Sequence, residues 1–479
     1  MKNPTDYYNS MLSNPLTSFL AEVPRGEAIK DALRKDLPPI PDDQVRQLPA
    51  NVRLRLLSVL RSFHIPLGRD LALAEFIIDM VEDSYVNRRP SAEQLLREEA
   101  ALREFKRLDL RLTESDLEAI GGALVGMSGT GKTRTIRRIL RLLRQVVVHD
   151  VENNKLLPPL SISWLIVECP SNRSLTALAA AIFSAIEQAT KELIPASLKA
   201  GNQSVLIQNV ANLCSRYALG MLVVDEIQHV LNGAGKPDTE LLNFLVELSN
   251  RLQVPVLIVG TPLARHVVGG AMRQARRMLG PEWSNLKREE PAWKEFSTAL
   301  ISYQFTRELA PPQSVEPTLY ELTQGLPGLA VPLWRVSQRY AILLEAEDEE
   351  IKCVTPEIIA TVFDDHFQSV RPMVDALRSG DSDLIALYQD ISLDAENLDL
   401  ELAKEAITEK EKLRMELFNA RRSAVKKAKR IITASVINQT KPFAQLPGPS
   451  SPIANPLLAA FDNAVEDGKD PAAAVLAQA

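Results

Sequence analysis

The sequence predicts an α/β fold in which a parallel β-sheet is covered by helices on both faces. Two observations lead to this prediction. A glycine-rich segment, GMSGTGKT at residues 126–133, lies between a short apolar run and a helical pattern. A second apolar run, MLVVDE at residues 221–226, ends in two acids. Apolar runs alternate with helical patterns around both segments, which is typical of a parallel sheet.

Residues 126–133 match the pattern G-x-x-x-x-G-K-[ST] of a phosphate-binding P-loop. Its glycines let backbone N–H groups curl around an anion, and the next helix adds its positive N-terminus. The pattern also arises by chance, so the expected strand at 119–125 and helix at 133–145 supply the necessary context. The residues predicted to hold ATP in this loop are Gly126, Ser128, Gly129, Thr130, Gly131, Lys132 and Thr133.

The run at 221–226 predicts a buried strand with acids at its carboxyl end. Asp225 would hold Mg²⁺ through water, Thr133 would offer its hydroxyl to the same ion, and Glu226 would polarise the attacking water. The alternative is a core strand that ends in acids by chance, and the upstream P-loop argues against it. The sequence therefore predicts ATP binding with Asp225, Mg²⁺ binding by Thr133 and Asp225, and hydrolysis through Glu226.

The remaining patterns predict four parts: a helical N-terminal region (1–95), an ATPase core (96–305), a helical lid (306–370) and a C-terminal segment (371–479). Helices are expected in the N-terminal region at 50–63 and 71–81, and a charged helix at 96–118 leads into the core. The lid should contain helices at 325–344 and 356–368. Further elements expected in the core are a strand at 161–169, a helix at 171–188 capped by Ser171 or Ser174, a helix at 238–252 and a strand at 254–260.

The C-terminal segment predicts a docking surface with a flexible end. An acid-rich stretch at 381–401 precedes a basic stretch at 410–430 on an expected long helix. Because the two blocks lie side by side, self-pairing or partner docking is favoured over free DNA binding. The last forty or so residues are rich in Pro, Ala and polar groups, which is typical of a flexible tail.

Composition limits the class of protein. The net charge of −6 excludes a chain that is cationic throughout, so any DNA contact must come from local basic patches. Three scattered cysteines give no disulfide framework, and the scattered histidines give no zinc spacing, so no structural metal is expected. No apolar leader and no long apolar run is present, so we expect a cytoplasmic protein without a membrane span.

Beyond the two nucleotide motifs, four pieces of the sequence stand out. They are Y-x-x-R-x-P at 85–90, VECPSNRSL at 167–175, IVGTP at 258–262, and TQGLPG at 323–328 followed by Leu333-Trp334 and Gln338. In this order they resemble the upstream element, the strand-to-helix signature, the sensor 1 strand and the lid signature of TnsC, the AAA+ regulator of bacterial transposons, and of its relatives TniB and MuB. The resemblance covers about 80–370.

The resemblance implies an AAA+ protein that binds ATP and polymerises along duplex DNA as a ring or helical filament of identical subunits. Such proteins present target DNA to a transposase and read a target-selection protein of the TniQ or TnsD type. Hydrolysis of ATP trims or dismantles the filament. The implied partners are therefore duplex DNA with weak sequence preference, further copies of the chain, the transposase and the target selector.

The resemblance also implies roles for single residues. Arg276 or Arg277, which follow sensor 1, would reach a neighbouring subunit's site as an arginine finger; the alternative is a solvated basic helix end. Thr261 stands where sensor 1 more usually has Asn, so it would orient water or merely cap the strand. Arg335 on the lid would act as sensor 2, leaning over the γ-phosphate, or would be an exposed arginine.

A DNA contact is implied at the top of the second strand, where Asn172 and Arg173 offer a small polar group and a cation for phosphates. The alternative is a simple helix N-cap. The helix after the P-loop carries a basic stripe, and for most of its residues we favour a solvated face over a subunit or DNA contact. The residues of that stripe are Arg134, Arg137, Arg138, Arg141 and Arg144.

Two other function classes stay open. A helicase loader would prefer single strands and use aromatic residues for stacking, and the core has few near its candidate DNA loop. A signalling ATPase would usually carry a recognisable sensor or repeat array, and the sequence has neither. A metabolic P-loop kinase fits less well, because the long helical flanks and the arginines after sensor 1 serve no small-substrate site.

Overall fold

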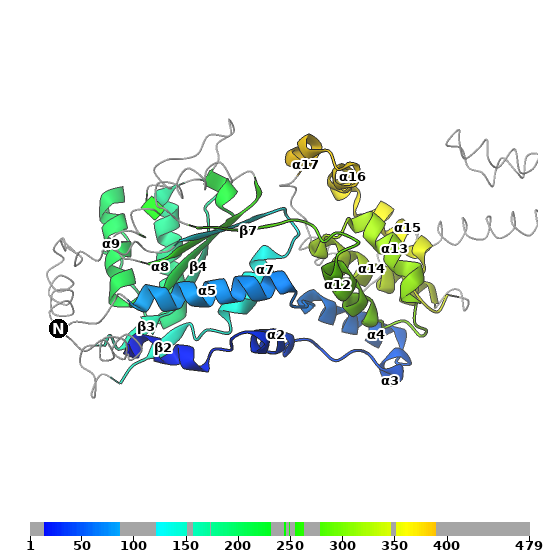
Figure 1. Ribbon diagram of the computed structural model, residues 1–479, viewed down its shortest axis with the longest axis horizontal. Helices are drawn as coiled ribbons and strands as arrows, with labels where there is room; N and C mark the ends of the chain where they lie inside the picture. Colours follow the sequence, from blue (N-terminus) through cyan, green and yellow to red (C-terminus); the bar gives the residue numbers. More distant parts are fainter. Residues whose placement is uncertain are drawn as a thin grey trace, which may run out of the picture. The chain divides into compact units, whose positions relative to one another are not determined.

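The computed structural model describes residues 14–86, 121–150, 157–172, 174–230, 244–245, 249, 254–262, 278–345 and 351–388. All of them belong to one compact unit, Met1–Ala395 (Figure 1). The second unit, Glu396–Ala479, lies outside the described residues. So do the predicted helix at 96–118, most of the predicted helix at 238–252 and the basic stretch at 410–430.

A parallel five-stranded sheet forms the centre of this unit, in the order β4-β5-β6-β1-β7. The P-loop strand β1 pairs in parallel with β6 on one side and β7 on the other. The α/β fold predicted from sequence is therefore confirmed. The strands are β1 (Gly122–Gly126), β4 (Trp164–Glu168), β5 (Met221–Asp225), β6 (Val256–Gly260) and β7 (Met278–Trp283).

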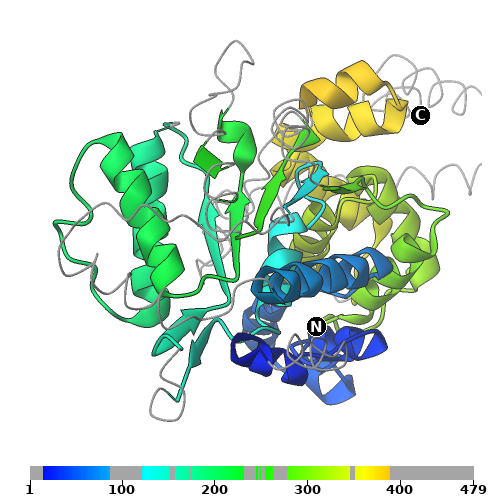
Figure 2. The same cartoon turned by 60° about the vertical axis from the view of Figure 1, so that its left-hand side comes forward.

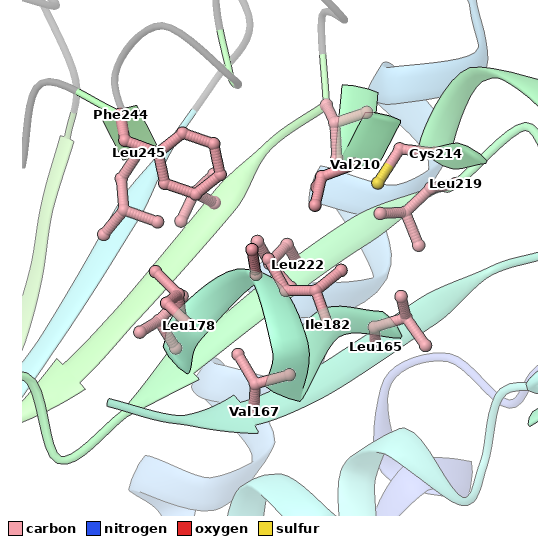
Figure 3. Close-up of a cluster of buried hydrophobic side chains, with 14 of the residues drawn as sticks. Leu165, Val167, Leu178, Ile182, Val210, Cys214, Leu219, Leu222, Phe244 and Leu245 are labelled. Carbon is pink, nitrogen blue, oxygen red and sulfur yellow. The ribbon is translucent and has the colours of Figure 1, made fainter. Parts of the chain in front are cut away.

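The two faces of the sheet bury alternate residues of the same strands. On β5, Leu222 and Val224 belong to one apolar cluster, whereas Met221 and Val223 belong to the other. The first cluster lies under α8 (Leu175–Thr190) and α9 (Gln203–Arg216), as Figure 3 shows. Successive residues of β5 point to opposite faces of the sheet, and both faces are covered. Its sequence is therefore a continuous apolar run.

The other face is covered by the N-terminal region and by the helix after the P-loop. Their apolar residues form the second cluster with the sheet. Figure 2 shows the green helices α8 and α9 on one side of the sheet and the blue helix α5 on the other. The helical elements of this face are η1 (Pro15–Glu22), α2 (Glu27–Arg34), α5 (Gly68–Val86) and α7 (Lys132–Leu140).

The strand predicted at 161–169 is two strands. Residues Leu160–Ile162 form β3, which pairs antiparallel with β2 (Val146–Val148), and the central sheet begins again at β4. Ser163 makes the break: its N–H donates to the Gln145 carbonyl at 2.9 Å, and its hydroxyl donates to the Arg144 carbonyl. An apolar run does not reveal this change of partner.

Strand β7 was not predicted from sequence. Its residues, MLGPEW, include a glycine and a proline, which are both rare inside strands. The strand lies at the edge of the sheet, and its register with β1 shifts between Ala123 and Val125. Proline is tolerated at such edges and bulges because its missing N–H needs no partner there.

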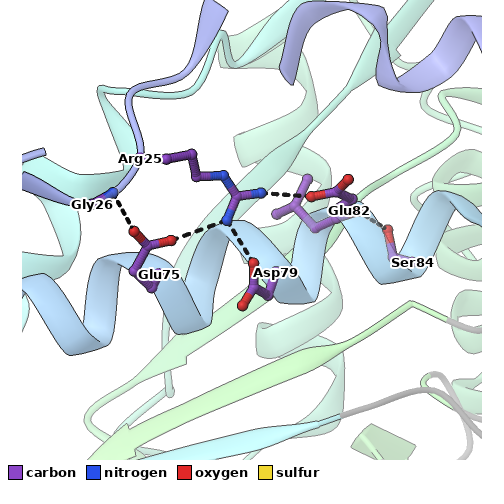
Figure 4. Close-up of polar contacts among 7 residues, drawn as sticks. Arg25, Gly26, Glu75, Asp79, Glu82 and Ser84 are labelled. Carbon is purple, nitrogen blue, oxygen red and sulfur yellow. Dashed lines mark hydrogen bonds and ion pairs between the residues drawn. The ribbon is translucent and has the colours of Figure 1, made fainter. Parts of the chain in front are cut away.

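An ion-pair cluster fixes the start of the N-terminal region onto α5. Arg25 contacts Glu75 at 3.1 Å, and Asp79 and Glu82 at 2.5 Å each (Figure 4). The N–H of Gly26 donates to Glu75 at 2.6 Å. The acids recur at spacings of three and four, so they share one face of the helix. Because these groups are exposed, each pair contributes little alone, and the cluster serves to place the chain.

The lid is an all-helical bundle built around α14 (Pro327–Glu345), whose residues from 329 to 344 are all buried except the half-buried Pro332. A short helix pair, α4 (Ala50–Leu56) and η2 (Leu57–Ser62), packs against it and replaces the single helix predicted at 50–63. The remaining helices are α3 (Asp43–Arg46), η3 (Ile227–Val230), α12 (Pro291–Ser302), α13 (Pro312–Thr323), α15 (Pro356–His366), η5 (Gln368–Val370), α16 (Arg371–Ser379) and α17 (Ser382–Tyr388).

The four-part division stays a prediction, and contacts cross two of its boundaries. Arg378 of α16 binds Glu321 of the lid at 2.7 Å. Arg53 of α4 is fully buried and pairs with both carboxylate oxygens of Glu345 at 2.9 and 3.0 Å. Arg53 also donates to the carbonyl of Phe305 at 3.1 Å. The N-terminal region and the lid are therefore joined by a buried charge.

We expect Arg53→Ala to lower the free energy of unfolding by about 1.5–3 kcal/mol, because it removes the charge-assisted hydrogen bonds to Glu345 and leaves only the exposed Arg307 as a counter-charge for that carboxylate. Arg55→Ala, an exposed change two residues further along the same helix, is the matched control and should cost less than about 0.5 kcal/mol. Urea denaturation followed by circular dichroism measures both. Equal midpoints for the two variants would contradict the role given to Arg53.

Candidate nucleotide-binding site

The P-loop joins the buried strand β1 to helix α7. Gly129 and Gly131 have φ values of 78° and 94°, which residues with a Cβ rarely adopt. The Lys132 ammonium donates to the carbonyls of Gly126 and Met127 at 2.6 and 2.8 Å, so its side chain folds back over the loop. Helix α7 begins at Lys132 and ends at Leu140, five residues short of the predicted end, because β2 follows at Val146.

The carboxyl end of β5 meets the start of α7. The Thr133 hydroxyl donates to Asp225 Oδ2 at 2.7 Å, and the N–H of Glu226 donates to Asp225 Oδ1 at 2.9 Å. Asp225 is only 2% exposed. A hydroxyl and a carboxylate side by side are the oxygen ligands that Mg²⁺ takes in proteins. The residues predicted to hold ATP and Mg²⁺ therefore lie together and fit both groups.

Glu226 lies where β5 ends and η3 begins. Its φ of 55° is unusual for a residue with a side chain, which marks a strained backbone next to the site. Burial raises the pKa of its carboxyl group, and repulsion by Asp225 raises it further. Lys132 and His229 oppose this shift by their positive charge. A carboxylate that is poised in this way suits a general base.

Thr261 lies beside this acid, directly after β6, and is 3% exposed. Its N–H donates to Gln228 Oε1 at 3.2 Å, and Gln228 Nε2 donates to the Glu226 carboxylate. The Thr261 hydroxyl oxygen is buried and has no hydrogen-bond partner among the described residues. The arrangement joins Glu226 and Thr261 through Gln228, which sequence reasoning missed, and the sensor 1 role of Thr261 stays a prediction. The only signal for Gln228 was its place two residues after Glu226.

The lid reaches the P-loop through a glycine pair. The N–H of Gly328 donates to the Gly129 carbonyl at 2.8 Å, and a Cβ at Gly328 would lie 2.8 Å from the Gly129 Cα. Arg335, two turns further along α14, is 6% exposed. Burial, with Arg61 and Arg134 nearby, lowers its pKa to about 10. It is therefore not an exposed lid arginine, and its role as sensor 2 stays a prediction.

Arg69 of α5 holds the P-loop from the N-terminal side, and sequence reasoning missed it too. Its guanidinium donates to the Thr130 carbonyl at 2.8 Å and to the Ser284 carbonyl at 3.0 Å. The same group lies 4.4 Å from the centre of the Trp283 ring, at the end of β7. One side chain thus ties α5, the loop and the edge strand together.

Most of the basic stripe is a solvated face, as favoured from the sequence: Arg134, Arg137, Arg141 and Arg144 are exposed. Arg138 is the exception, at 9% exposed, and donates to the Ser62 carbonyl at 2.5 Å. Arg134 donates to the Phe63 carbonyl at 3.1 Å. The carbonyls at the end of η2 are without helical partners, and cations satisfy such groups well. Two residues of the stripe therefore also bind the N-terminal region.

The predicted DNA and finger residues are only partly described. Arg173, Arg276 and Arg277 lie outside the described residues. Asn172 is exposed, and its side-chain oxygen accepts from the Ser174 N–H at 3.1 Å. Ser174, one of the two predicted caps, accepts from the Ala177 N–H at 3.3 Å and caps α8. Ser174, rather than Asn172, is therefore the helix N-cap of this loop, and the DNA contact of Asn172 stays a prediction.

The strand-to-helix segment beyond β4 is bonded to the acidic end of β5. The Cys169 N–H donates to the Asp225 carbonyl at 2.8 Å, and His229 Nδ1 lies 2.9 Å from the Cys169 carbonyl. These bonds fix the start of the loop that carries Asn172.

Within the part of the chain that the structure describes, no helix is both long and apolar enough to cross a membrane.

Three solved structures share partial similarity with the chain. The Orc1 protein of Aeropyrum pernix, solved in complex with DNA, is 16% identical over 60% of this chain and 67% of its own, with a TM-score of 0.35. Cdc6p of Pyrobaculum aerophilum is 14% identical over 60% and 70%, with a TM-score of 0.34. A Walker-type ATPase of Pyrococcus abyssi is 13% identical over 66% and 88%, with a TM-score of 0.34.

No curated protein sequence matches the chain. A family model does match: residues 119–268 fit the model of the AAA domain. This range includes β1, the P-loop, β5 and β6, and therefore every residue of the geometry around Lys132, Asp225, Glu226 and Thr261. The chain thus contains the nucleotide-binding AAA domain of a P-loop ATPase.

Proposed function

We propose that this protein is an ATP-dependent, DNA-binding regulator of transposition. It assembles as a homo-oligomer on duplex DNA and links a target-selection protein to the transposase. The proposal rests on the resemblance of four sequence pieces, at 85–90, 167–175, 258–262 and 323–328, to the TnsC family. The segment from 371 to 479 is proposed to dock the transposase, and Arg276 or Arg277 to complete a neighbouring subunit's site.

The chemistry proposed for the site is hydrolysis of ATP. Lys132 and the N–H groups of the P-loop bind the phosphates, and Thr133 and Asp225 hold Mg²⁺. The ion, when bound, neutralises charge on the phosphate oxygens. Glu226 orients a water molecule and accepts its proton on a carboxylate oxygen. The observation that supports this assignment is the joint placement of Thr133 and Glu226 on the two oxygens of Asp225.

In this proposal, hydrogen bonds between the DNA-binding loop and the nucleotide site couple DNA binding to ATP binding. The loop with Asn172 and Arg173 follows Cys169, whose N–H and carbonyl bind Asp225 and His229. A DNA phosphate that moves this loop therefore acts on the residue that holds Mg²⁺. A helicase loader or a signalling ATPase remains the alternative, and a preference for single-stranded DNA, or no DNA binding, would favour it.

Lys132→Ala should abolish ATP binding and, with it, DNA binding. Hydrogen bonds to charged groups contribute about 1.5–3 kcal/mol each, and Lys132 is the lysine of the loop. Titration with a fluorescent ATP analogue measures the affinity. Lys199→Ala, a change in an exposed ion pair with Glu187, is the matched control and should bind as the parent does. Unchanged affinity in Lys132→Ala would refute the site.

Glu226→Gln should keep ATP binding and slow turnover by roughly 10²–10⁴-fold, because the amide has the same shape but accepts no proton at neutral pH. Assemblies on DNA should then last longer. Glu168→Gln is the control. Glu168 is exposed and lies opposite Asp225 in the register of β4 and β5, but its carboxylate contacts Arg137 rather than the groups around Glu226. Phosphate release at saturating ATP distinguishes the two, and a parental rate in Glu226→Gln would rule out the catalytic role.

The protein should bind duplexes of unrelated sequence with similar affinity, and only with ATP or a slowly hydrolysed analogue. Contacts to phosphates should make the logarithm of the affinity fall linearly with the logarithm of salt concentration. Fluorescence anisotropy on two unrelated duplexes, and on a single strand of equal length, measures this. Binding without nucleotide, or a strong preference for one sequence, would count against the proposal. A strand-transfer assay with added transposase then tests the biological role.

A further inference from the structure

We infer that Gln228 is a positioning residue for ATP hydrolysis: its side-chain amide fixes the Glu226 carboxylate to the backbone of Thr261. The inference rests on the proposed role of Glu226 as the base. It adds a residue that neither the P-loop nor the acidic strand end includes. Gln228 lies on the short helix η3 and is 7% exposed.

Both ends of the Gln228 amide are in use. Nε2 donates to the Glu226 carboxylate, and Oε1 accepts from the Thr261 N–H at 3.2 Å. An inverted amide would set N–H against N–H at Thr261 and oxygen against oxygen at Glu226. The surroundings therefore determine the orientation of the amide. A buried side chain held at both ends has little freedom, so it can act as a rigid spacer.

The spacer joins the ends of two neighbouring strands. Glu226 follows β5 and Thr261 follows β6, and these strands pair through Val224 and Ile258. The buried Thr261 hydroxyl, which has no partner among the described residues, belongs to the residue whose backbone Gln228 holds. Gln228 therefore fixes both the base and a second polar group at the edge of the sheet beside the P-loop strand, since β6 also pairs with β1.

Two variants separate the two bonds. Gln228→Leu removes both at similar size, and Gln228→Glu removes the donor but keeps an acceptor for the Thr261 N–H. Both should lower kcat roughly 10- to 100-fold with little change in KM for ATP. A base that is displaced slows the chemical step and leaves nucleotide binding intact, so the split between kcat and KM distinguishes positioning of Glu226 from damage to the whole site.

A second measurement needs no nucleotide. Hydrogen–deuterium exchange of the Thr261 amide, followed by mass spectrometry of peptides over 257–262, reports the other bond. Exchange should be faster in Gln228→Leu and stay slow in Gln228→Glu. Gln188→Leu, an exposed change on α8, is the matched control and should alter neither exchange nor kinetics. The exchange experiment remains decisive if either variant is too slow for steady-state kinetics.

The outcomes separate this inference from the proposed function. A parental rate in Glu226→Gln would refute the base, whatever the Gln228 variants do. If Glu226→Gln is inactive while Gln228→Leu keeps the parental kcat, the inference about Gln228 is wrong and the function stands. A loss of kcat in Gln228→Leu with unchanged Thr261 exchange, or with an equally large rise in KM for ATP, would also overturn it, because those results describe general damage.

Discussion

The buried carboxylate of Asp225 is the interaction on which the rest of the site depends. A charge that is 2% exposed must have partners, and this one has the Thr133 hydroxyl and the Glu226 N–H. Its backbone carbonyl binds Cys169 as well. One residue at the end of β5 therefore fixes the start of α7, the position of the base and the beginning of the loop beyond β4. A parallel sheet makes this possible, since it gathers the carboxyl ends of its strands at one edge.

The parts of the site that could be predicted from sequence are those that are local in the chain. Lys132 and Thr133 belong to one loop, and Asp225 and Glu226 end one apolar run, so spacing alone identified them. Gln228 escaped because its partner Thr261 is 33 positions away. Arg69 and the Thr130 carbonyl are separated by 61 positions. No pattern within a single segment predicts a contact that the fold alone brings together.

The fold could be predicted from the sequence to a similar extent as the site. Strands buried on both faces, such as β5 and β6, read as apolar runs, and the sheet they form is the one expected. The edge strand β7 escaped because edge position and a bulge tolerate Gly and Pro, which argue against a strand elsewhere. The break at Ser163 escaped because a change of strand partner leaves no mark on hydropathy. Domain bounds depend on contacts such as that of Arg53 with Glu345, which sequence patterns do not contain.

The glycine contact between lid and P-loop has a mechanical consequence. Gly328 binds the Gly129 carbonyl directly, with no room for a side chain between the two backbones. Any swing of α14 away from the sheet therefore breaks a bond of the loop itself and frees a peptide group within it. A displacement of the lid and a change in the geometry of the P-loop therefore occur together. A force applied to the distant end of α14, at Glu345, therefore reaches the phosphate loop along the backbone of one helix, which contains Pro332 near its start.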